Sequence, residues 1–162
     1  MAVGSADLWK SINAAWDASS LDTLFRAVSS GSHVVLHDQQ ASPGQAHPYC
    51  VVSQMSQNTV NRMSGGVDSL REVRDTQVQF NIYAEEVSGD SRSAKQIAAY
   101  LAEEVMKVFG GHPTTAPTGS MILDNGNVLI NEYQTDYGVR IDDDEFLWVV
   151  TYTIRADVPV MA

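Results

Sequence analysis

The sequence predicts an α+β fold in a single domain, an antiparallel β-sheet with helices packed on one face. Residues 76–83 alternate apolar Val78, Phe80 and Ile82 with polar side chains, which is the two-residue period of a strand with one buried face. Residues 94–109 repeat apolar side chains every three or four positions, which is the period of an amphipathic helix. The other apolar segments are mostly strand-like, so this helix is expected to pack on a sheet.

Both ends of the expected helix are marked in the sequence. Ser93 and Gln96 have the spacing of a capping box, and Ser91 could instead cap the helix one turn earlier. Gly110 and Gly111 supply the stop, because glycine readily ends a helix. The larger apolar residues on the side expected to meet the sheet are Ile97, Leu101, Val105 and Phe109.

Two helices are expected within residues 1–30, before the sheet begins. Apolar spacing predicts the first over about residues 6–18. The second begins at Ser20, whose hydroxyl can cap it. A short strand is then expected over residues 33–37, followed by an exposed, turn-rich loop over residues 38–47.

Three more strands complete the predicted sheet, over residues 48–55, 128–137 and 146–156. Residues 140–145 are the expected turn between the last two. The final strand has apolar residues on both faces, which predicts a central position in the sheet. Residues 112–127 have the composition of a linker.

The polar segment over residues 57–74 has two readings. It could be a long loop, or the tips of two strands that extend beyond the sheet. A structureless loop of this length is unusual inside a domain, so the sequence favours a protruding hairpin with a flexible tip. Its basic residues Arg62, Arg71 and Arg74 are candidate assembly contacts.

The charge balance argues against a protein with a dedicated nucleic-acid-binding surface. Ten basic against twenty acidic residues give a net charge of −10, and a dedicated nucleic-acid surface needs clustered Lys and Arg. Residues 112–162 alone hold eight acidic and two basic residues, a local charge of −6. The ordinary interpretation of such an excess of acidic residues is a solvated surface that keeps the protein soluble.

The sequence carries no sign of a membrane or secretory destination. It contains no apolar run of the roughly 18 residues that a membrane span needs, and its N-terminus lacks the pattern of a signal peptide. We therefore expect an intracellular protein at synthesis, with no membrane partner. The single Cys50 has no internal disulfide partner and is expected to be an inert core thiol.

Motifs for catalysis or cofactor binding are weak throughout. His33 and His37 would lie about 13 Å apart on one strand face, too far for one zinc ion. The turn Asp142–Glu145 could hold a hard cation but lacks the ligand pattern and glycine of a calcium loop. The sequence has no phosphate-binding loop, nucleophile elbow or Cys and His cluster, so we expect neither an enzyme nor a cofactor.

The order of these features resembles the tail-completion family of long-tailed, siphophage-like bacteriophages, the tail terminators. The matching segments are the N-terminal helix, residues 48–52 opening a strand, residues 78–85 running into residues 93–98, and the strand over residues 146–154. The resemblance implies a non-enzymatic subunit of a hexameric ring that caps the tail tube and joins it to the head-tail connector.

The resemblance also implies partners and a location. The partners are further copies of the chain, the tail tube protein and a head-tail connector or neck protein. The location is the head-proximal end of the virion tail, reached by assembly in the host cytoplasm. DNA would pass through the ring lumen without specific binding, which an acidic lumen favours by repulsion. The candidate rim of this passage is the acidic turn of Asp142, Asp143, Asp144 and Glu145.

Two alternative functions stay open at this point. One is another neck protein, a head-side connector or stopper, because both kinds of protein are small ring subunits. The other is a small enzyme or ligand-binding domain that uses the sheet face near His33, His37 and Asp38.

The hairpin over residues 57–74 gives a first testable prediction. Its polar composition buries too little surface to order it alone, so we expect fast amide hydrogen exchange in the free subunit and slow exchange after assembly. Hydrogen exchange followed by mass spectrometry measures both states. Equally slow exchange in the free and assembled protein would contradict the prediction.

Overall fold

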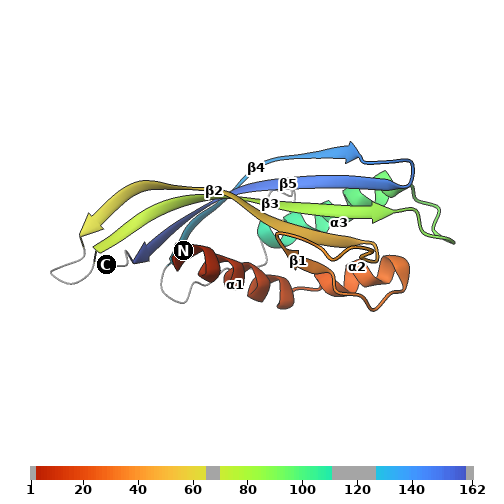
Figure 1. The fold of residues 1–162 in the computed structure, drawn as a ribbon, viewed down its shortest axis with the longest axis horizontal. Helices are drawn as coiled ribbons and strands as arrows, with labels where there is room; N and C mark the ends of the chain where they lie inside the picture. Colours follow the sequence, from red (N-terminus) through yellow and green to blue (C-terminus); the bar gives the residue numbers. More distant parts are fainter. Residues whose placement is uncertain (1–2, 65–69, 111–126, 160–162) are drawn as a thin grey trace.

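The computed structural model describes residues 3–64, 70–110 and 127–159 of the chain. Figure 1 shows its helices and strands along one elongated α+β domain. Their order and bounds are α1 (Val3–Asp17), α2 (Leu21–Ser29), β1 (Leu36–Asp38), β2 (Tyr49–Ser64), β3 (Leu70–Glu85), α3 (Ala94–Phe109), β4 (Asn127–Arg140) and β5 (Glu145–Pro159).

The strands form one five-stranded sheet with the order β1-β2-β3-β5-β4. Strands β2, β3, β5 and β4 pair in antiparallel fashion, whereas the short β1 pairs in parallel with β2. The sheet is therefore mostly antiparallel, which confirms the predicted α+β fold class, and the three-residue β1 is its parallel member. The final strand β5 lies between β3 and β4, which confirms its predicted central position.

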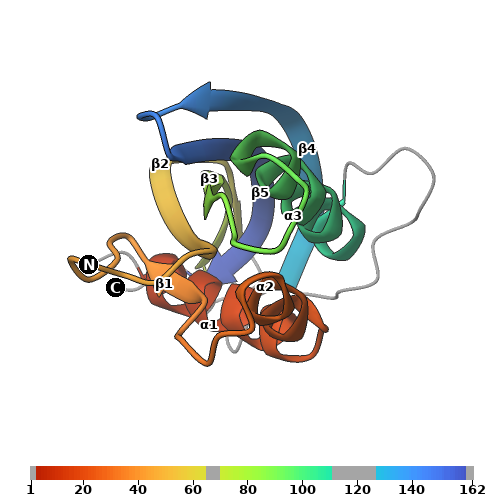
Figure 2. The same ribbon diagram turned by 90° about the vertical axis from the view of Figure 1, so that its right-hand side faces the viewer.

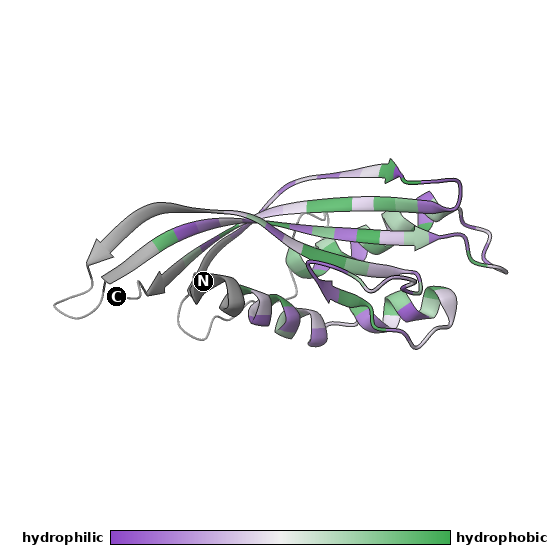
Figure 3. Cartoon of the chain, viewed as in Figure 1, coloured by the Kyte–Doolittle hydropathy of each residue, from purple (hydrophilic) through white to green (hydrophobic). Residues whose placement is uncertain are grey.

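The helices cover one face of this sheet. Figure 2 shows the sheet curling around α3, with α1 and α2 beside it. Along β3, the residues Val78, Phe80 and Ile82 are buried on the helix side, while Gln77 faces the opposite way and is exposed. The same alternation of polar and apolar residues is visible along β3 in Figure 3.

The start and end of α3 follow the sequence signals. The Ser93 hydroxyl accepts a hydrogen bond from the Gln96 amide, and the Gln96 side chain accepts one from the Ser93 amide. Gly110 ends the helix at a positive φ of 115°, and its amide donates to the carbonyl of Met106. The capping box at Ser93 is therefore the one used, not the alternative cap at Ser91.

Phe80 joins the helices to the sheet. Its ring stacks against Trp16 of α1 with centroids 6.4 Å apart, and it meets Phe109 of α3 at 4.7 Å. Tyr152 of β5 packs edge-on against it at 5.6 Å. Aromatic pairs at these separations stabilise beyond their buried area, so this cluster anchors both α1 and α3 to the sheet.

The first strand begins later than the sequence predicts. Instead of residues 33–37 it spans Leu36–Asp38, because neighbouring groups engage His33. The Arg26 side chain donates to the His33 carbonyl at 2.9 Å, and the His33 ring bonds to the Pro48 carbonyl at 2.7 Å. These bonds keep His33 away from β2, so pairing with that strand begins only at Val35 and Leu36.

The expected hairpin segment consists largely of paired strands. Strand β2 continues to Ser64, which pairs with Leu70 at the start of β3, and the register shifts twice along the pair. Residues 65–69 at the tip lie outside the described residues, as does most of the expected linker over residues 112–127.

Cys50 is fully buried, as expected, and burial raises the pKa of its thiol well above the ordinary value. A thiol of raised pKa carries little thiolate, so it is a poor nucleophile. Among the described residues, no helix has the length and apolar character needed to cross a membrane.

A charge placed on the buried face of α3 should prevent folding. Leu101 is fully buried, so Leu101→Asp puts an unpaired carboxylate in the core, a cost of several kcal/mol against a usual total of about 5–15 kcal/mol. The exposed Lys95→Asp on the same helix is the matched control and should melt almost like the unchanged protein. Thermal unfolding followed by circular dichroism measures both variants. A soluble Leu101→Asp protein with a cooperative transition would mean that α3 packs through another face.

Candidate functional site

Three titratable side chains meet where β3 ends and β5 begins. Glu85 and Glu145 occupy directly paired positions of the two strands, and the imidazole of His47 lies between them. His47 Nδ1 lies 3.3 Å from Glu85 Oε1, and His47 Nε2 lies 2.9 Å from Glu145 Oε2. A loop residue thus bridges two strands through both ring nitrogens.

This site is only partly open to solvent. The side chains of His47 and Glu145 are 16 % and 20 % exposed, whereas that of Glu85 is 44 % exposed. Like charges directly opposite each other on neighbouring strands destabilise a sheet. The two carboxylates therefore need a positive partner, and the imidazole of His47 occupies the position where a proton or a metal ion would supply it.

Tyrosines form one wall of the site. Tyr49 stacks on Tyr83 with centroids 4.9 Å apart, and the rings of His47 and His37 pack against Tyr49 at 5.0 and 5.7 Å. Burial, followed by the negative charge of Glu145, raises the pKa of Tyr49 to about 12. The same two causes raise the pKa of Tyr83. Both phenols are therefore neutral at physiological pH.

The structure divides the acidic turn into two parts. Asp142, Asp143 and Asp144 are exposed, whereas Glu145 is turned toward His47. Asp142 organises the turn, because its Oδ1 accepts hydrogen bonds from the amides of Asp144 and Glu145, each at 2.9 Å. Arg140 donates to the carbonyls of Asp142 and Asp143. The three aspartates form a solvated end of the molecule, while Glu145 belongs to the histidine cluster.

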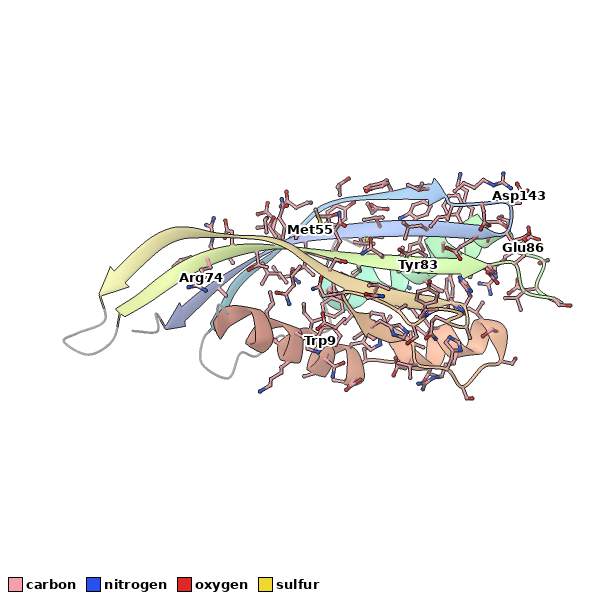
Figure 4. The ribbon with its side chains drawn as sticks, in the orientation of Figure 1. Trp9, Met55, Arg74, Tyr83, Glu86 and Asp143 are labelled. Atoms are coloured by element: carbon pink, nitrogen blue, oxygen red, sulfur yellow. The ribbon has the colours of Figure 1, made fainter. Side chains whose placement is uncertain are left out.

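The acidic turn and the candidate assembly arginines lie far apart. Figure 4 shows Asp143 and Glu86 at one end of the long axis and Arg74 toward the other. Arg74 is half-buried within β3, where it pairs in register with Thr59 of β2 and Ala156 of β5. The side chains of Arg62 and Arg71 lie outside the described part of the structure.

The residues of the alternative ligand site do not converge. The ring of His33 bonds to the carbonyl of Pro48, and that of His37 bonds to the carbonyl of Val34. Asp38 is exposed at the end of β1. Both imidazoles thus bond to backbone carbonyls, and that of His37 also packs against Tyr49, so they do not form an acid-base pair.

Sequence reasoning missed His47 and Glu85 as site residues. His47 lies in a segment expected to be an exposed loop, and Glu85 ends a strand without any motif around it. The available signal was an acidic residue, Glu85, just after one predicted strand and another, Glu145, just before a second. It becomes informative only once these two strands are known to be neighbours.

Comparisons with known proteins give a likeness of fold. No family model matches the sequence, and no curated protein matches it. A solved structure described as the virion of a native gene transfer agent particle contains a chain that superposes with a TM-score of 0.56 and 14 % identity. The match covers 97 % of this chain and 99 % of that one, so the likeness extends over the whole domain.

Removing the imidazole should expose the repulsion between the two carboxylates. In metal-free buffer, we expect His47→Ala to lower the free energy of unfolding by about 1 kcal/mol, as measured by urea denaturation. Adding Glu85→Gln should recover part of this loss, because one of the two opposed charges is then gone.

The neighbouring Glu86→Gln provides the matched control, because Glu86 is exposed and lies outside the pair. Equal recovery with Glu85→Gln and Glu86→Gln would show that general acidity, and not the opposed pair, sets the stability.

Proposed function

We propose that this chain is a structural protein of a phage-like virion and that it acts as a tail terminator. The observation that carries the proposal is the match over nearly the whole length to a chain of a gene transfer agent virion. The match supports a structural protein of a phage-like virion. The finer assignment as a tail terminator rests on the sequence resemblance to the tail-completion family. In this role the chain forms a hexameric ring at the head-proximal end of the tail and has no chemistry of its own.

The sheet face opposite the helices, which no described helix covers, supports self-assembly. Tyr137 and Val139 of β4 lie on the face opposite the helices and are 47 % and 41 % exposed. Strand β4 is also an edge strand, with no sheet neighbour on its outer side among the described residues. Exposed apolar side chains beside an open sheet edge are favourable sites for contact with another subunit.

The two ends of the domain suit contacts with two different partners. The long β2–β3 hairpin extends from one end, and the exposed aspartates 142–144 lie at the other (Figure 1). In the proposed ring, the hairpin contacts the tail tube protein or the connector. The aspartates then border the passage through which DNA travels, without binding it.

The charge of the chain supports a passage that does not retain DNA. Six copies of a chain of charge −10 give a ring of about −60, which repels phosphates at low salt. A head-side connector or stopper would share this property. A reconstruction of assembled particles decides between them, since density for this chain between tail tube and connector is expected for a terminator and density on the head side contradicts it.

Oligomeric state is the first experimental test. Size-exclusion chromatography with light scattering should give a discrete ring-sized oligomer, either for the purified protein or after tail tubes are added. A protein that stays monomeric or dimeric in both conditions would contradict the proposal. It would favour the small ligand-binding domain instead.

Reversal of charge at the acidic turn tests the proposed passage. We choose Asp143→Lys with Asp144→Lys, because Asp142 holds the turn and Glu145 contacts His47. The pair changes the charge by four per subunit, about 24 in a ring of six, while exposed charges cost at most about 1 kcal/mol each in stability. Ejection of DNA from particles that contain the variant should slow at low salt and recover at high salt.

The matched control reverses two exposed charges elsewhere, with Asp17→Lys and Glu103→Lys on α1 and α3. It should leave ejection unchanged. Normal ejection at low salt with the variant at the turn would mean that these aspartates face away from the DNA.

A further inference from the structure

We infer that His47, Glu85 and Glu145 form a binding site for a divalent transition metal ion, with Zn²⁺ as the best match. One possible ligand atom from each residue lies within 4.8 Å of the others. The site is separate from the proposed terminator role and does not rest on it. Its effect would be to tie the loop that carries His47 to the ends of β3 and β5.

The donor set suits this class of ion. Imidazole nitrogen and carboxylate oxygen are ordinary ligands of zinc, at about 2.0–2.2 Å from the metal. Three protein ligands leave the fourth position of a tetrahedral zinc ion for a water molecule, as is common in zinc sites that are open to solvent. A mixed nitrogen and oxygen set also favours zinc over calcium or magnesium, which prefer oxygen ligands alone.

The geometry needs only a small adjustment to hold the ion. Ligand atoms on a tetrahedral zinc lie about 3.3–3.5 Å apart, as follows from the bond lengths. Nε2 of His47 and Oε2 of Glu145 are already 2.9 Å apart, so opening this pair slightly admits the metal. Glu85, the most exposed of the three side chains at 44 %, can rotate toward the ion from its present contact with Nδ1.

The local charge favours a dication over a proton. With a neutral imidazole, Glu85 and Glu145 give the site a charge of −2, which a protonated imidazole only halves and a divalent ion cancels. Arg140, the basic residue of the adjoining turn, donates to the carbonyls of Asp142 and Asp143. Among the described residues, Arg140 forms no ion pair with Glu85 or Glu145, whose partner is His47.

The surroundings also hold the imidazole in place. The ring of Tyr49 packs against His47 at 5.0 Å and is itself stacked on Tyr83. Gln45, two residues before His47, donates its side-chain amide to the Val34 carbonyl at 3.0 Å, which ties the loop to the segment before β1. An imidazole fixed by its neighbours loses less entropy when it binds a metal, so the site is partly preorganised.

Metal binding to the purified full chain is the test. Isothermal titration with Zn²⁺ after chelator treatment should give one ion per chain, and Zn²⁺ should raise the melting temperature of the protein. Co²⁺ in place of Zn²⁺ should give the intense visible absorption of a tetrahedral site. His47→Ala and Glu145→Gln should each weaken Zn²⁺ binding by about tenfold or more and remove the thermal shift.

Two further variants make the result specific to this site. Glu85→Gln changes the most exposed ligand and should keep the fold while also weakening Zn²⁺ binding about tenfold. Asp143→Asn with Asp144→Asn removes exposed carboxylates of the nearby turn and should leave the affinity unchanged. Absence of binding, or equal affinity in the chain with and without His47→Ala and Glu85→Gln, would overturn the inference. So would loss of binding in the Asp143→Asn and Asp144→Asn control.

Discussion

The packing of Phe80 is the contact on which the arrangement of the domain depends. Its ring meets Trp16 of α1, Phe109 of α3 and Tyr152 of β5, so one buried side chain in the third strand fixes two helices and a neighbouring strand. Because β-strand side chains alternate between faces, the same strand sends its glutamines to the opposite side. The one-sided cover of the sheet follows directly from this alternation.

In the described part of the chain, no helix covers the other face of the sheet and no strand pairs with the outer edge of β4. A sheet edge and exposed apolar side chains such as Tyr137 and Val139 tend to associate with other chains. Assembly into a ring would turn this liability into a specific contact. The likeness of fold to a chain of a virion particle and the exposed apolar residues beside the edge strand are independent observations.

The end of the sheet near Glu145 carries both an exposed acidic surface and a half-buried cluster around His47, which the sequence does not distinguish. Four consecutive acidic residues look alike in the sequence, yet the structure exposes Asp142, Asp143 and Asp144 and directs Glu145 toward His47. The difference arises because Glu145 is the first residue of β5 and faces Glu85 across the ladder. A surface charge and a member of a half-buried cluster can thus be neighbours in the chain.

The sequence by itself determined those helices and strands that depend on interactions between residues close together in the chain. The alternation over residues 76–83 and the capping box at Ser93 act within a few residues, and the structure confirms both. Only the tertiary structure decided the parallel pairing of β1 and the meeting of His47, Glu85 and Glu145. The physical reason is that strand register is set by side-chain packing between segments distant in the chain, and residues 47, 85 and 145 share no local pattern that encodes it.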